Sequence, residues 1–88
     1  MISRALSLTD TRQKLVSAHT GAQYVYLHVE GNNEIYLGGA DVTSSNGLHT
    51  VKHTAPLTFF LPAGNELWAV CSSGETADVR ILQENGAD

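Results

Sequence analysis

Alternation of apolar and polar residues is clearest over residues 24–30, where the sequence is YVYLHVE. Val25, Leu27 and Val29 fall on one parity, and the two tyrosines and the histidine fall on the other. A period of two, with β-branched and aromatic residues, is typical of a β-strand. This segment is therefore predicted to be a strand whose valine–leucine face lies in the core.

Shorter segments of the same character lie along the chain, separated by residues that favour turns. The strands are predicted at residues 1–10, 24–30, 35–37, 57–61, 67–71 and 77–82. Gly31-Asn32-Asn33 is expected to join the second and third of these as a hairpin, because Gly and Asn adopt turn conformations at low cost. The predicted fold class is all-β, a small antiparallel β-sandwich or β-barrel of six to eight short strands.

The ends of the chain are expected to differ from its middle. Residues 1–20 are predicted to be an N-terminal strand or an extended docking arm, residues 21–83 the sandwich or barrel core, and residues 84–88 a polar tail. Within the first part, residues 11–18 are expected to form a strand rather than a short helix. Residues 48–55 are apolar only at Leu48 and Val51, so an exposed loop or edge strand is expected there.

Size and charge narrow the possible functions. A chain of 88 residues has a thin core, and its one cysteine cannot form an internal disulfide, so burial against a partner is a common way to add stability. The net charge is −4 and the five basic residues are scattered, which argues against a nucleic-acid-binding surface. No apolar run approaches the ~18 residues of a transmembrane helix, and no export signal is visible at the N-terminus. Neither nucleic acid nor membrane is therefore expected as a partner.

The residue types that carry chemistry form no catalytic or metal-binding pattern. His49 and His53 are four apart, but the four histidines match no ligand motif. Cys71 shares its parity with Leu67 and Ala69, which places the thiol in the core rather than at an active site. The sequence therefore predicts a protein that is not an enzyme, with no catalytic residue, no cofactor and no metal.

Outward-facing aromatic residues are the candidate contact surface. Tyrosine and tryptophan opposite the core parity could form a second hydrophobic layer, stack on sugars, or anchor a protein contact. The N-terminal apolar residues could add a strand to a neighbouring molecule. The predicted protein-interface residues are Ile2, Leu6, Leu8, Tyr24, Tyr26, Tyr36 and Trp68.

Two motifs, IYLGGADVTSSNG and LTFFLPAGNELWAVCSSGETADVRILQ, resemble a pattern in small structural proteins of tailed bacteriophages. The resemblance spans residues 34–82 and rests on turn and core positions, with Trp68 where tyrosine is usual and Cys71 as a second departure. It implies a head-decoration, head-fibre or other virion-surface module, and it carries no catalytic residue. The matched positions are Tyr36, Leu37, Gly38, Gly39, Asp41, Val42, Thr43, Asn46, Gly47, Leu61, Pro62, Gly64, Glu66, Leu67, Ala69, Ser73, Gly74, Ala77, Val79 and Ile81.

The function expected from this resemblance is that of a phage capsid decoration (cement) protein. Such a protein binds the outside of the assembled head and stabilises it through non-catalytic contacts. The expected partners are the major capsid protein and further copies of the chain in a homotrimer, on a virion assembled in the host cytoplasm. The alternative is a carbohydrate- or receptor-binding β module of a phage fibre or tail.

Overall fold

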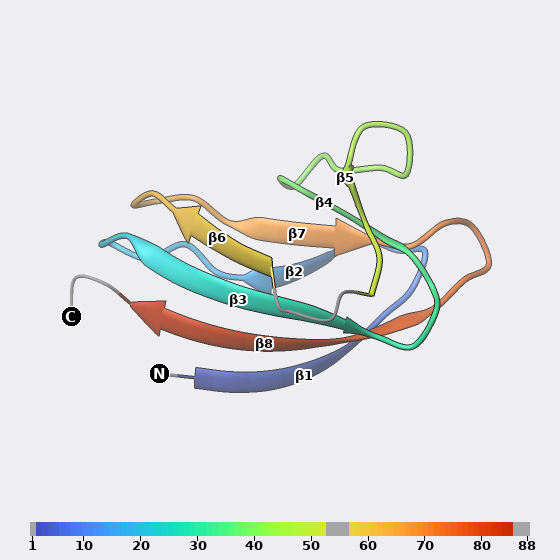
Figure 1. The fold of residues 1–88 in the computed structure, drawn as a ribbon. Coiled ribbons are helices and arrows are strands. Elements are labelled where there is room, and N and C mark those ends of the chain that lie inside the picture. The colour runs from blue at the N-terminus through green and yellow to red at the C-terminus, as the bar shows by residue number, and fades with distance from the viewer. Residues whose placement is uncertain (1, 53–56, 86–88) are drawn as a thin grey trace.

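Eight β-strands build the part of the chain that the computed structural model describes, residues 2–52 and 57–85 (Figure 1). Sheet A has the strand order β1-β8-β3-β6, and sheet B has the order β2-β7-β4-β5. Every neighbouring pair is antiparallel. The all-β prediction is confirmed, and the architecture is a sandwich. The strands are β1 (Ile2–Leu8), β2 (Gln13–Val16), β3 (Gln23–Glu30), β4 (Ile35–Gly38), β5 (Leu48–Thr50), β6 (Leu57–Leu61), β7 (Leu67–Val70) and β8 (Ala77–Asn85).

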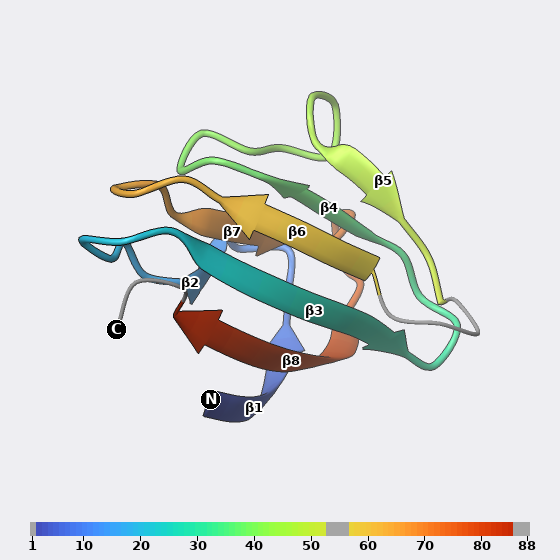
Figure 2. The same cartoon turned by 60° about the vertical axis from the view of Figure 1, so that its left-hand side comes forward.

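Successive strands cross from one sheet to the other, except β4 and β5, which pair directly in sheet B. Eight strands connected in this order form a jelly roll. Both sheets are ordered in the same sense, so β1 and β2 lie along one side of the sandwich and β5 and β6 along the other (Figure 2). The fold therefore has two open sides, each bounded by the edge strands of the two sheets.

The predicted hairpin at Gly31-Asn32-Asn33 is wrong. β3 pairs with β6 and β8 in sheet A, whereas β4 pairs with β5 and β7 in sheet B. Gly31 does adopt a positive φ of 80°, so the sharp turn is present. Turn-forming residues at this position reverse the direction of the chain, but they do not determine which strand β4 pairs with. The buried faces of both strands are covered because β4 crosses to the opposite sheet.

The core lies between the sheets and has β3 at the centre of one wall. Val25, Leu27 and Val29 are almost fully buried, as their parity predicts. Each of them lies beside a residue of β8 in register, and the pairs are Val25 with Gln83, Leu27 with Ile81 and Val29 with Val79. The remaining buried cluster consists of Leu8, Leu15, Val16, Ile35, Leu37, Leu61, Leu67, Ala69, Cys71 and Ala77, with Leu6 and Phe59 packed against it.

The N-terminal segment follows the strand alternative of its prediction, and the predicted start of the polar tail needs correction. β1 pairs with β8 over its whole length and β2 pairs with β7, and Leu8, Leu15 and Val16 are fully buried. Residues 2–16 are thus part of the sandwich rather than a detached docking arm. At the other end β8 continues through residues 84 and 85, which were expected in the polar tail, because they pair with β3. Met1 and residues 86–88 lie outside the described residues.

The glycine-rich stretch after β4 is a compact turn that fixes the β4–β5 connection. Val42 is buried and belongs to this turn. The backbone N–H of Gly47 donates to the Thr43 carbonyl at 2.9 Å, and the Thr43 N–H donates to the Asn46 side chain at 2.7 Å. A Cβ on Gly47 would lie only 2.6 Å from the Cβ of Tyr36. These residues therefore serve architecture, and β5 follows as the predicted edge strand.

Candidate functional site

The predicted interface residues do not form one surface. Tyr24 and Tyr26 lie on the outer face of sheet A, whereas Tyr36 and Trp68 lie on the outer face of sheet B. These are opposite faces of the sandwich. All four have the outward parity that the alternation predicts, and Tyr24 is the most exposed of them, at 42%.

The N-terminal members of that set belong to the inner face of sheet A. Leu8 has 0% of its surface exposed, so its assignment to an interface is wrong for the folded chain. Leu6 is half-buried against the core. Ile2, however, remains 47% exposed, because it lies at the end of an edge strand. The alternation along the sequence predicts that Ile2, Leu6 and Leu8 share one face. It does not predict how far sheet B extends over that face.

Phe60 is the exposed aromatic residue that sequence reasoning missed as a contact residue. It lies on β6, points away from the core and is 56% exposed. Its ring meets that of Tyr24 edge to face, with centroids 5.4 Å apart and planes at 63°. The sequence does indicate that Phe60 points outward, because its parity is opposite to that of Phe59. An exposed aromatic pair on the flat face of a sheet is typical of a contact surface.

A shallow groove lies on the same outer face, across β1, β8 and β3. Its volume is ≈ 540 Å³, and its lining includes Ala5, Tyr26 and Leu82. Arg80 and His28 add polar groups to the lining, and His28 Nδ1 lies 2.7 Å from Glu30 Oε2. This combination of an apolar lining with a few polar groups suits a side chain or a small ring from another molecule.

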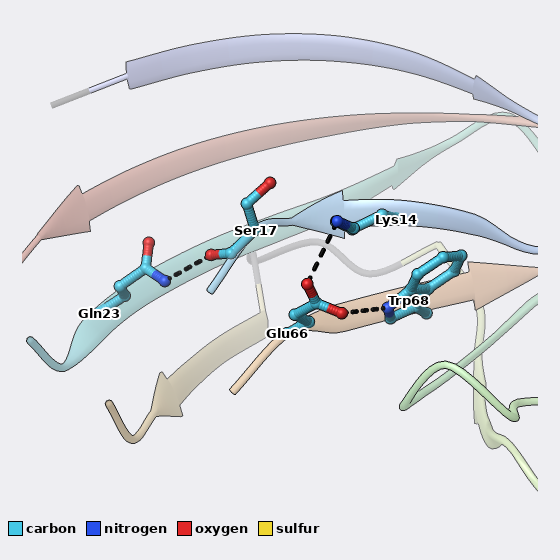
Figure 3. Close-up of polar contacts among 5 residues, drawn as sticks. All are labelled: Lys14, Ser17, Gln23, Glu66 and Trp68. Carbon is cyan, nitrogen blue, oxygen red and sulfur yellow. Dashed lines mark hydrogen bonds and ion pairs between the residues drawn. The ribbon is translucent and has the colours of Figure 1, made fainter. Parts of the chain in front are cut away.

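The outer face of sheet B is occupied by contacts within the chain (Figure 3). Trp68 Nε1 donates to Glu66 Oε1 at 3.1 Å, and Lys14 Nζ lies 3.2 Å from Glu66 Oε2. The Lys14 ammonium also lies over the Trp68 ring, 5.8 Å from its centroid. Trp68 is thus held in place by its own neighbours, which makes it a weaker candidate for a contact residue than Tyr24.

The pKa of the Glu66 carboxyl is lowered, first by the hydrogen bond from Trp68 and then by Lys14. Because the folded state favours the ionised carboxylate, these contacts stabilise the fold at pH values above the pKa of an ordinary glutamate. This stabilisation is lost as the pH falls through the lowered pKa of Glu66 in the folded state. We expect the fluorescence of Trp68, the one tryptophan, to titrate with a midpoint below that of an ordinary glutamate. The transition should disappear in Glu66→Gln. A midpoint at the ordinary glutamate value would contradict these contacts.

A buried polar contact ties the two sheets together at the start of β3. Gln23, only 1% exposed, donates from Nε2 to the carbonyl of Ser17 at 2.9 Å (Figure 3). Gln83 Nε2 donates in turn to Gln23 Oε1 at 2.6 Å. Ser17 directly follows β2 of sheet B, whereas both glutamines are in sheet A. The contact therefore holds the two sheets in place and has a structural role.

Cys71 lies in the core, as its parity predicts, and is 2% exposed. Burial raises the pKa of its thiol, and the carboxylates of Glu75 and Asp10 raise it further. The neutral thiol is thus favoured over the nucleophilic thiolate. Across residues 2–52 and 57–85, no three His, Cys, Asp or Glu side chains are grouped to hold a metal ion. His53, half of the His49–His53 pair, lies outside the described residues.

Comparison with known proteins adds a likeness of fold. No family model matches the sequence, and no curated protein matches it. One similar solved chain comes from a structure described as "Bacillus endospore appendages form a novel family of disulfide-linked pili". It aligns with a TM-score of 0.56 and 13% identity, over 96% of this chain and 83% of that one. At this identity the likeness shows the fold alone. In the described part of the chain, no helix is long and apolar enough to cross a membrane.

Proposed function

We propose that this chain is a non-catalytic structural subunit that decorates the outside of a phage capsid. The observation that carries the proposal is the exposed aromatic pair of Tyr24 and Phe60 on the outer face of sheet A. Aromatic residues at the centre of a contact supply much of the binding energy of protein interfaces. The groove beside the pair, with Tyr26 and Leu82 in its lining, extends the same apolar surface.

Two likenesses support this class of function. The turn and core motifs between residues 34 and 82 resemble those of phage virion proteins, as described above. The similar solved chain belongs to a pilus, so a sandwich of this kind also serves as the unit of a protein polymer. Disulfide linkage as in that pilus would need Cys71, which is the one cysteine here and is buried. Copies of this chain would therefore hold together by non-covalent contacts.

The mechanism follows from many weak contacts acting together. Each bound copy adds a modest apolar contact across neighbouring capsid subunits, and the shell gains from their sum. The major capsid protein is the proposed partner, and the homotrimer is the proposed bound form. Three linked copies would dissociate far more slowly than one, because all three contacts must open together.

The proposal predicts that Tyr24→Ser weakens binding to shells by about tenfold or more, because it removes one ring of the aromatic pair. The measurement is co-sedimentation of the purified protein with assembled shells that lack it. The matched control is Tyr24→Phe, which keeps the ring that meets Phe60 edge to face, removes only the hydroxyl, and should bind like wild type. If both variants bind like wild type, the aromatic pair is not the docking surface. If wild type does not bind shells at all, the proposed function is wrong.

A carbohydrate- or receptor-binding module of a fibre or tail is the second candidate. The specific observation in its favour is that the exposed Tyr24–Phe60 pair lies on the same face as a groove with Arg80 and His28 in its lining. Exposed rings stack on sugars, and the polar groups could bind hydroxyls. Saturable binding to a glycan array without binding to shells would favour this candidate over decoration.

A further inference from the structure

Sheet A ends in two open edges. β1 and β6 are its outermost strands, and each has a neighbour on one side only. Natural proteins usually protect such edges with proline, lysine or inward-pointing charges. Arg4 is the single charged residue in the two strands, and neither strand contains proline. By register Arg4 lies beside Ile81 and shares the inward parity of Ile2 and Leu6, so β1 carries one inward-pointing charge. The edge of β6 is thus open to another strand, and the edge of β1 is protected by that single charge.

The direction of the strands fits a second copy of the same chain. All neighbours in sheet A are antiparallel, so β1 and β6 run in opposite directions. If one copy is followed by another in the same orientation, β6 of the first lies antiparallel to β1 of the second. The sheet then continues across the boundary in its own pattern, and no strand has to reverse.

The register brings matching side chains to the boundary. Gln83 pairs with both Ile2 and Val25, and Val25 pairs with Phe59, so these four residues form one row across sheet A. An unshifted repeat of the sheet places Phe59 of one copy beside Ile2 of the next. Ile2 is 47% exposed in the single chain, and Phe59 is half-buried at the opposite edge. Both are on the inner face, so the contact would join the cores of the two copies.

The next row is equally compatible with a second copy. It runs from Ser3 through Leu82 and Tyr26 to Thr58, so the repeat places Thr58 beside Ser3 of the following copy. The outward residues of β1 are Ser3, Ala5 and Ser7, which are small and leave room for a neighbour. Leu48 and Val51, on the same side of the sandwich as β6, are 58% and 38% exposed and make that side more apolar still.

We propose that copies of this chain associate edge to edge, with β6 of one copy pairing antiparallel with β1 of the next and Phe59 packing against Ile2. The proposed occupant of each edge is another copy, because the strand direction fits and the register sets Phe59 beside Ile2 and Thr58 beside Ser3. The same register sets Leu57 beside Arg4, the one charged residue of the contact. The contact is heterologous: it closes into a ring, such as the proposed trimer, where the rotation between copies allows, and otherwise continues as a filament. This inference rests on the proposed assembly function and names the surface that links its subunits.

The test uses two single variants of the full chain, one for each edge. Ile2→Lys places an ammonium group opposite Phe59 at the inner face of β1. Thr58→Lys, at an exposed position on β6, places an ammonium group beside Ser3 of the next copy on the outer face. Each should weaken self-association, measured by sedimentation velocity over a concentration series, by about tenfold or more. Ser44→Lys, with the same change of charge in the exposed β4–β5 loop, should associate like wild type. Circular dichroism checks that all variants are folded.

Mixing the two edge variants decides whether the contact is heterologous. Ile2→Lys retains an intact β6 edge, and Thr58→Lys retains an intact β1 edge, so an equimolar mixture should form one-to-one heterodimers and nothing larger. A wild type that stays monomeric overturns the inference, as does association that neither edge variant weakens. A mixture that stays monomeric while the wild type associates also overturns it.

The inference and the proposed function fail in different experiments. Shell binding by a monomeric wild type would remove the edge contact and keep the decoration role. Edge-dependent association without shell binding would keep the contact and remove the phage capsid as the partner. The Tyr24→Ser variant separates the two surfaces, because Tyr24 lies on a central strand and should leave self-association unchanged.

Discussion

Replacing Leu27 by alanine is expected to lower the free energy of unfolding by about 2–5 kcal/mol, the usual cost of a large cavity in a core. Leu27 is 1% exposed on β3, with Ile81 and Leu57 as its neighbours in sheet A. A domain of this length has a total stability of roughly 4–13 kcal/mol at ~0.05–0.15 kcal/mol per residue. The substitution would therefore remove a large part of it. Urea denaturation followed by Trp68 fluorescence measures the change.

Leu27→Met is the matched control, because it keeps the volume and should cost less than about 1.5 kcal/mol. If Leu27→Ala costs no more than Leu27→Met, with the same dependence on urea, Leu27 does not lie in a close-packed core. The arrangement of β3 between β6 and β8 would then be wrong.

Replacing Gln23 by methionine is expected to cost about 2–4 kcal/mol, although the new side chain has a similar volume. The Ser17 carbonyl and the Gln83 amide would each lose their partner in a buried setting, at about 1–3 kcal/mol per group. Thermal and urea unfolding of the purified variant both measure the loss.

The partner substitution gives this prediction its control. Gln83 Oε1 is buried and has no partner among the described residues, so Gln83→Met removes an amide that is only half satisfied. We expect Gln83→Met to cost less than Gln23→Met, and the double variant to be more stable than Gln23→Met alone. Strictly additive costs would contradict a direct contact between the two glutamines.

The sequence predicts the strands of this protein better than it predicts their partners. The alternation of Val25, Leu27 and Val29 identifies β3 and its buried face, because the period of two is a local property. The pairing of Ile2 with Gln83 joins residues at opposite ends of the chain, and no local pattern encodes it. For this reason residues 1–20 were interpreted in part as an arm, although β1 completes sheet A.

The sequence also indicates which polar residues lie on the core face. Gln23 shares its parity with Val25, and Gln83 shares its parity with Ile81, so both could have been placed inward from the alternation. Two glutamines with inward parity in strands imply a buried hydrogen bond between them. Their contact with Ser17 depends on how the sheets stack, which the sequence does not show.

The candidate site shows the same division. Parity places Tyr24, Tyr26, Tyr36 and Trp68 outward, but only the sheet order divides them between two faces. Phe60 has the parity opposite to that of the buried Leu61 but is absent from the predicted interface residues, and its exposure beside Tyr24 makes it a candidate contact residue. The proposed interface, the trimer and the capsid partner remain predictions, because each concerns a second molecule.

Under the proposed function the chain is encoded by a phage, and image reconstruction of the particles of that phage tests this central claim most directly. The account predicts density for an eight-stranded sandwich on the outside of the head, present at regular positions, with the outer face of sheet A against the major capsid protein. A head surface without such density, in particles that contain the protein elsewhere or not at all, would contradict the proposed role.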